Sequence, residues 1–196
     1  KKEKQCFVFR RVIPTVTAAA DVTINHEIKT RWKTTGMEVK MEVDVLKRVP
    51  VKEQDPKVRA TNFKEVCLGY TEEEAIAEAG RCLGCKIALC MKGCPVSSDI
   101  PGFIAEVKKG NFAEAYQIIS KYSALPAVCG RVCPQESQCE SKCIRGIKGE
   151  AVSIGKLERF VADWAREHGV SPKPAEQMNG KKVAVVGSGP AGLTCA

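Results

Sequence analysis

Four cysteines lie within the stretch "CLGCKIALCMKGCP", residues 82–95, and four more within "CGRVCPQESQCESKC", residues 129–143. The N-terminal residues have too short an apolar run for a signal peptide, and the reducing cytosol keeps thiols free of disulfides. Closely spaced thiols in such a chain are better explained as metal ligands than as partners in disulfide bonds. The fold therefore has to present two cysteine-bearing loops, and the surrounding elements are expected to hold those loops in place.

Zinc is the first alternative for these thiols. Structural zinc sites usually pair two short Cys-x2-Cys units, often with histidine. Only Cys82 and Cys85 have that spacing, and His26 and His168 lie outside both runs. The sequence therefore gives a zinc-stabilised interaction module little support, and we keep it as the alternative.

Iron–sulfur clusters fit the spacing better. Ferredoxin-type runs end in Cys-Pro, and that last cysteine ligates a second cluster; Cys94 is followed by proline here. If Cys94 serves the other cluster, then Cys82, Cys85 and Cys90 need a fourth ligand from the second run. Two interlocked clusters follow. The spacing alone offers eight cysteines for two four-ligand clusters and does not say whether all eight are used.

Composition narrows the class of protein. The chain has 196 residues, of which 44% are hydrophobic, enough to bury a core. No stretch approaches the run of about 20 apolar residues that a membrane helix needs. The net charge of +8 comes mostly from residues 1–70, which lack interleaved aromatic residues, so nucleic-acid binding is disfavoured. We expect a cytoplasmic protein that binds neither membrane nor nucleic acid.

Helix signals surround the first cysteine run. Thr71 and Glu74 form a capping-box pattern, with acidic residues in the first turn where the helix dipole favours them. This helix leads to Cys82. A second helix is expected in "DIPGFIAEVKKG", residues 99–110, because an aspartate and a proline stand near its start and a glycine ends it.

Two further helices are expected after the first run. Residues 111–123, "NFAEAYQIISKYS", carry apolar residues at helical spacing. The stretch "SIGKLERFVADWAREHG", residues 153–169, has a potential cap in Ser153, a terminating glycine in Gly169 and a clear apolar stripe. Glu158 falls at the edge of that stripe. From the helix alone, Glu158 reads as a solvated flank position, since charged residues are mostly exposed.

The C-terminal residues carry a second motif. In "KKVAVVGSGPAGLTCA", residues 181–196, the apolar run 183–186 predicts a buried strand that turns through glycines into a helix. Gly187 permits the tight turn, Gly189 lets the backbone approach a pyrophosphate, and Gly192 lets helix and strand pack closely. The pattern is that of a dinucleotide-binding, Rossmann-type fold.

The domain organisation that we expect follows from these signals. It comprises an extended or disordered extension at 1–40, an extended arm at 41–70, a helical metal-binding domain at 71–170, a proline-rich linker at 171–180 and the start of a nucleotide-binding domain at 181–196.

Taken in order, four motifs resemble one family. They are "EAGRCLGCKIALCMKGCPVSSDIPGFI", "CGRVCPQESQCESKC", "SIGKLERF" and "VAVVGSGPAG". Residues 41–196 resemble the N-terminal part of the glutamate synthase (NADPH) small subunit, a module shared with the large subunit of NADH-dependent ferredoxin:NADP oxidoreductase and with dihydropyrimidine dehydrogenase. The resemblance implies a mainly α protein: an α-helical ferredoxin-like domain with two 4Fe-4S clusters, followed by a truncated FAD-binding domain.

The same resemblance implies a division of ligands between the clusters. One cluster would be held by Cys82, Cys85, Cys90 and Cys143. The other would be held by Cys94, Cys133, Cys139 and, in the motif that reads "GKLERF" here, Glu158. Cys129 is then expected to be a spare.

The resemblance also implies a function. In the intact family member, electrons pass from NAD(P)H to FAD and through the clusters to a partner flavin-containing subunit, such as the glutamate synthase large subunit, or to ferredoxin. The glycines 187, 189 and 192 would bind FAD. The acidic residue expected about 20 positions later and the pyridine-nucleotide domain are missing from the sequence. We therefore expect an electron-transfer fragment of an oxidoreductase, inactive alone, in which no residue makes or breaks bonds of a substrate.

Overall fold

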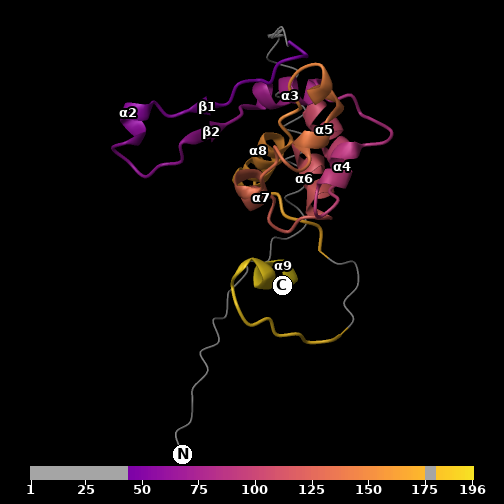
Figure 1. Ribbon diagram of the computed structural model, residues 1–196. Helices are drawn as coiled ribbons and strands as arrows, with labels where there is room; N and C mark the ends of the chain where they lie inside the picture. The colour runs from indigo at the N-terminus through magenta and orange to yellow at the C-terminus, as the bar shows by residue number, and fades with distance from the viewer. Residues whose placement is uncertain (1–43, 175–179) are drawn as a thin grey trace, which may run out of the picture. The chain divides into compact units, whose positions relative to one another are not determined.

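The computed structural model describes residues 44–174 and 180–196, which fold mainly as short helices (Figure 1). The prediction of a mainly α protein is confirmed. In chain order, the elements are β1 (Lys52–Glu53), α2 (Pro56–Arg59), β2 (Cys67–Gly69), α3 (Glu72–Gly80), α4 (Leu89–Gly93), α5 (Ile100–Lys108), α6 (Phe112–Ser120), α7 (Pro126–Val132), the 3-10 helices η1 (Glu140–Lys142) and η2 (Ile144–Ile147), α8 (Ile154–Glu167) and α9 (Pro190–Cys195). The expected extension at 1–40 lies outside the described residues.

Local sequence signals explain where two of the helices begin. At the start of α3, the Thr71 hydroxyl accepts from the Glu74 N–H at 3.3 Å, and the Glu74 carboxylate accepts from the Thr71 N–H at 2.9 Å. This is the predicted capping box. At the start of α5, the Asp99 carboxylate accepts from the Gly102 N–H at 3.0 Å. Both caps satisfy backbone donors that a helix terminus leaves unpaired.

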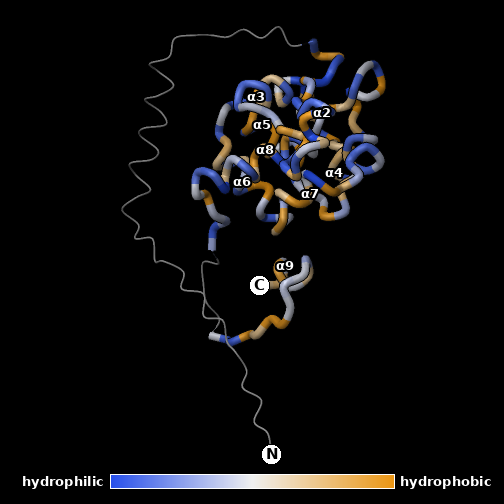
Figure 2. Tube along the Cα trace, turned by 90° about the vertical axis from the view of Figure 1, so that its left-hand side faces the viewer, coloured by the Kyte–Doolittle hydropathy of each residue, from blue (hydrophilic) through white to orange (hydrophobic). Residues whose placement is uncertain are grey.

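The core lies between α3, α5, α6 and α8. Figure 2 shows hydrophobic residues of α5 and α8 gathered inside this group of helices. Phe112 of α6 makes edge-on contacts with Phe160 and Trp164 of α8, at ring-centre distances of 5.1 and 5.3 Å. Such aromatic pairs stabilise the packing beyond the area that they bury. The buried apolar side chains include Phe103, Ile104, Val107, Ile119, Leu157 and Val161.

The segment 44–70, which the sequence predicted as part of an extended arm, contains a short antiparallel hairpin. Strands β1 and β2 pair with Lys52 opposite Gly69, and α2 lies between them in sequence. Long side chains connect this segment to the helices. The Arg159 guanidinium donates to the carbonyl oxygen of Cys67 at 2.7 Å, and the Arg131 guanidinium donates to the Glu65 carboxylate at 2.7 Å. Within the segment, the Tyr70 hydroxyl donates to the carbonyl oxygen of Val49 at 2.8 Å.

The C-terminal residues form only part of the predicted strand-turn-helix. Helix α9 follows Gly189 as expected. Gly187 has φ +118°, and a Cβ at Gly192 would collide with the Gly187 carbonyl oxygen, so this turn needs glycine at both positions. The predicted strand at 183–186 is not confirmed, because within the described residues this run pairs with no other strand. A run of apolar residues becomes a strand only through hydrogen bonds to a neighbouring strand.

No helix in the described ranges, 44–174 and 180–196, is long and apolar enough to span a bilayer.

Candidate metal centres

Two single helical turns bring the cysteine runs together. Cys90 lies in α4 and Cys94 directly follows it, while Cys139 and Cys143 flank η1. These turns pack backbone to backbone, since a Cβ on Gly93 would lie 2.6 Å from the carbonyl oxygen of residue 138. Each turn therefore has one cysteine near its start and one directly after its end. The two cysteine runs meet here although they are far apart in sequence.

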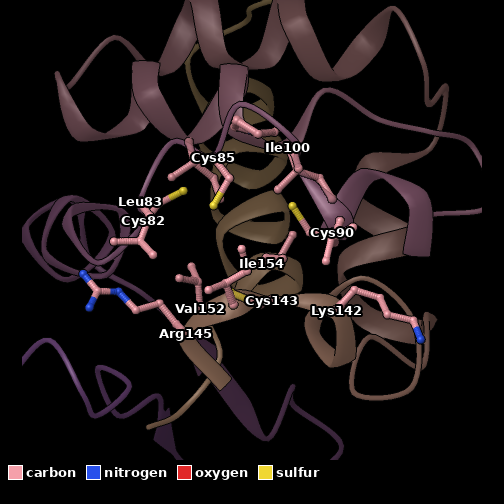
Figure 3. A pocket seen from close by; sticks show the side chains of 15 residues that line it. Cys82, Leu83, Cys85, Cys90, Ile100, Lys142, Cys143, Arg145, Val152 and Ile154 are labelled. Carbon is pink, nitrogen blue, oxygen red and sulfur yellow. The ribbon is translucent and has the colours of Figure 1, made fainter. Parts of the chain in front are cut away.

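The first group of thiols surrounds one apolar pocket. Cys82 follows α3, Cys85 lies in the next loop, Cys90 comes from α4 and Cys143 follows η1. All four line the same pocket, whose walls include the buried side chain of Ile154. Figure 3 shows the four cysteines around one space, with Ile100 on one side and Val152 and Ile154 on another. Separate segments thus supply thiols from different directions, as a four-ligand centre requires.

Burial keeps thiols of this group protonated in the absence of metal. Desolvation raises the pKa of Cys90 to about 11, and the neighbouring thiols of Cys143 and Cys82 add to the effect. Desolvation likewise raises the pKa of Cys82. Thiolates are the metal-binding form, so a cation entering this pocket has to displace the protons.

A second group forms around Cys94, Cys133 and Cys139. Burial, the charges of Glu158 and Cys94, and its contact with the Cys129 thiol raise the pKa of Cys133 to about 11. Burial, together with the charges of Glu140, Cys94 and Glu158, raises that of Cys139 to about 12. The thiols and the Glu158 carboxylate are thus within electrostatic range of one another.

Glu158 carries a half-buried carboxylate near the thiols. Desolvation alone raises its pKa to about 7. Within the described part of the chain, no residue donates a hydrogen bond to its carboxylate or forms an ion pair with it. A carboxylate in a half-buried position normally has such a partner. The assignment of Glu158 as a ligand stays a prediction.

Cys129 lies in α7, one helical turn before Cys133. Its thiol contacts the Ser123 hydroxyl at 3.6 Å and also lies near the Cys133 thiol, whose pKa it helps to raise. Its carbonyl oxygen accepts from the Gln135 side chain at 3.0 Å. Cys129 thus belongs to the second group by position, while its thiol already has two neighbours. Its assignment as a spare stays a prediction.

The separation of the donors bears on the kind of centre that they could hold. Among residues 44–174 and 180–196, no three His, Cys, Asp or Glu side chains converge closely enough to hold one metal ion. Ligands of a cubane are separated by its iron and sulfide atoms, so they stand further apart than the ligands of one zinc ion. Four cysteines around one apolar pocket fit that requirement.

Buried charged residues around these groups escaped the sequence analysis. The carboxylate of Glu78 accepts from Arg81 at 2.5 Å, and neither side chain is exposed to solvent. The carboxylate of Glu140 accepts from Arg48 at 2.7 Å. Arg81 precedes Cys82 and Glu140 follows Cys139 directly, so both pairs adjoin the predicted ligands. Glutamate and arginine are usually exposed, and only the structure reveals that Glu78, Arg81 and Glu140 are buried.

The helical region matches a known family. Residues 59–170 fit the family model described as dihydropyrimidine dehydrogenase domain II, 4Fe-4S cluster.

Curated proteins that resemble the chain are oxidoreductases. The glutamate synthase [NADPH] small chain of Escherichia coli is 40% identical over 152 residues, covering 77% of this chain and 32% of that protein. Its counterpart from Halomonas elongata is 40% identical over 154 residues, covering 76% and 33%. The NAD-dependent dihydropyrimidine dehydrogenase subunit PreT of Escherichia coli is 42% identical over 130 residues, covering 66% and 31%. The chain thus spans about a third of the length of these relatives.

Proposed function

This chain belongs to the family of dihydropyrimidine dehydrogenase domain II with its 4Fe-4S cluster, and from that premise we propose that it holds two such clusters and conducts electrons between a flavin and a partner protein. The observation that carries the proposal is the arrangement of four cysteines from separate segments around one apolar pocket. A cluster of this type accepts and releases electrons without making or breaking bonds of a substrate. The chain's own residues have to bind it, exclude water and set its charge environment.

Each cluster has its own ligand set in this proposal. Cys82, Cys85, Cys90 and Cys143 hold the first, supported by their common pocket. The second is held by Cys94, Cys133, Cys139 and Glu158, supported by the mutual effects on their pKa values. Oxygen is a harder donor than thiolate, so Glu158 gives the second cluster a different potential and stability from an all-cysteine site.

The electron path extends beyond this chain. Because similar proteins are named as small chains of NADPH-dependent glutamate synthase, we propose an NAD(P)H-dependent, FAD-containing parent enzyme and a partner oxidoreductase subunit, such as a glutamate synthase large subunit. Gly187, Gly189 and Gly192 would contribute to the flavin site. By itself the chain would bind clusters and show no turnover. The free thiols of both groups also suit the reducing cytoplasm.

The test is anaerobic purification with analysis of iron, acid-labile sulfide, zinc and flavin. We expect a brown protein with absorbance near 400 nm, about eight irons and eight sulfides per chain, and little flavin. Stoichiometric zinc with no visible absorbance would instead establish the zinc-stabilised module. About four irons per chain would reduce the proposal to a single cluster.

A further inference from the structure

Helix α8 begins without a cap of its own. Ser153 stands at the N-cap, yet its side chain makes no capping hydrogen bond. Lys156 occupies the third helical position, where a capping box needs glutamate or glutamine. Lysine has no acceptor, so no local capping box can form. The predicted capping by Ser153 is right in position and wrong in its hydrogen bond.

Two buried glutamates from other elements supply the missing acceptors. The Glu140 carboxylate accepts from the Gly155 N–H at 3.2 Å, and the Glu78 carboxylate accepts from the Ser153 N–H at 2.8 Å. The second helical residue and the N-cap are two positions whose N–H groups a helix N-terminus leaves for side chains to accept. Glu140 is 4% exposed and Glu78 is fully buried. The start of α8 is therefore capped by η1 and α3 and not by its own sequence.

Two arginines complete this arrangement. Arg48 donates to Glu140 and to a carbonyl oxygen of the segment 150–151, both at 2.7 Å. Arg81 donates at 2.5 Å to Glu78 and also at 2.5 Å to the other carbonyl oxygen of that segment. Buried carboxylates are tolerated when they are paired and hydrogen-bonded in this way. The chain entering α8 is thus fixed through its carbonyl groups as well as its N–H groups.

We propose that Glu140 is a positioning residue, which places the Glu158 carboxylate against the second group of thiols by capping α8. Glu140 directly follows Cys139, and the Gly155 N–H that it accepts lies three residues before Glu158. One carboxylate therefore connects a thiol of the second group to the helix that carries the oxygen donor. This inference rests on the proposed function, since it assigns Glu158 to the second cluster.

The test distinguishes two properties of Glu140: the length of its side chain, which lets it accept from the Gly155 N–H, and its negative charge. Glu140→Gln keeps the side-chain length and an oxygen acceptor for Gly155, while it removes the negative charge facing Arg48. Glu140→Asp keeps the charge and withdraws the acceptor from Gly155. Glu136→Asp is the matched control, because Glu136 is exposed and lies between the same two ligands, Cys133 and Cys139. Each chain is reconstituted anaerobically, and iron content, EPR spectrum and midpoint potential are measured for both clusters.

We expect Glu140→Asp to change the EPR spectrum and midpoint potential of the second cluster, or to lose that cluster, while the first cluster is unaltered. Glu136→Asp should match the wild type. Glu140→Gln should keep the second cluster with its EPR spectrum, while the loss of a negative charge beside Cys139 raises that cluster's midpoint potential. An unaltered second cluster in Glu140→Asp, a lost second cluster or an altered EPR spectrum of it in Glu140→Gln, or loss of both clusters in Glu140→Asp overturns the inference. A wild-type chain without iron overturns the proposed function, and with it this inference, so the two failures are distinguishable.

Discussion

The backbone of Gly130 in α7 lies directly against that of Arg159 in α8: a Cβ on Gly130 would stand 2.6 Å from the Arg159 Cβ and 2.7 Å from its backbone nitrogen. A Cβ atom does not come so close to a carbon or nitrogen atom to which it is not covalently bonded, so only glycine fits at position 130. This contact sets the distance between α7, which ends directly before Cys133, and α8, which carries Glu158.

Gly130→Ala should separate α7 from α8 and destabilise the protein. The expected loss is about 1–3 kcal/mol of unfolding free energy, the usual cost of overpacking. Urea unfolding followed by circular dichroism measures it. Gly80→Ala is the matched control, since Gly80 lies in α3 with nothing within 4 Å of its added Cβ. That change should be neutral or slightly stabilising, because alanine favours a helix more than glycine does. Equal losses in both variants would contradict the prediction.

Cys90→Ser should remove one cluster and spare the other, because Cys90 belongs to the first pocket alone. We expect iron to fall from about eight to about four per chain. Cys129→Ser should retain all the iron. Colorimetric iron and sulfide analysis, with EPR to identify the remaining cluster, checks both variants. Retention of all the iron by Cys90→Ser would show that the first ligand set is wrong.

Glu158→Ala should impair the second cluster and leave the first intact, because it removes the oxygen donor beside Cys133. The expected result is loss of that cluster, or a shift of its midpoint potential, by the same measurements. Glu167→Ala, on the exposed C-terminal turn of α8, is the control and should behave as wild type. If Glu158→Ala and Cys129→Ser lost the same amount of iron, Glu158 would have no special role.

Tyr70 gives a prediction for alkaline pH. Burial raises its pKa from 10.0 to about 12. The neutral phenol is therefore favoured in the folded chain, and its contribution to stability is complete below pH 10 and is lost as the pH rises to 12. Tyr70→Phe should flatten this part of the pH profile in denaturant titrations. At neutral pH it should cost about 1 kcal/mol, because the Val49 carbonyl oxygen loses its donor. A profile of unchanged slope in the variant would contradict the assignment.

Helix positions were predictable where the signal is local. The Thr71–Glu74 box and the Asp99 cap need only neighbours in sequence, and the structure confirms both. The family resemblance also pointed to iron–sulfur chemistry, which the family match bears out. Helix α7 was missed, because its seven residues are too few for a clear apolar period.

Features that depend on residues far apart in the sequence could not be predicted from the sequence alone. The capping of α8 joins residues 15 and 75 positions apart. The hairpin of 44–70 is anchored by arginines of α7 and α8, among them Arg131, which donates to Glu65 at 2.7 Å. The strand at 183–186 requires a partner strand, and an apolar run cannot reveal whether one is present. Tertiary contacts decide such features, whereas propensity decides helix starts.

The two short turns at the thiols limit how far apart the bound centres can lie. Cys90 and Cys94 are four positions apart, as are Cys139 and Cys143, and each pair gives one thiol to each centre under the proposed assignment. Four residues span at most about 14 Å when extended and about 6 Å in a helix. An electron can tunnel over such a distance without any movement of the protein. The same proximity makes reduction of one centre repel an electron from the other, so their midpoint potentials should not be independent.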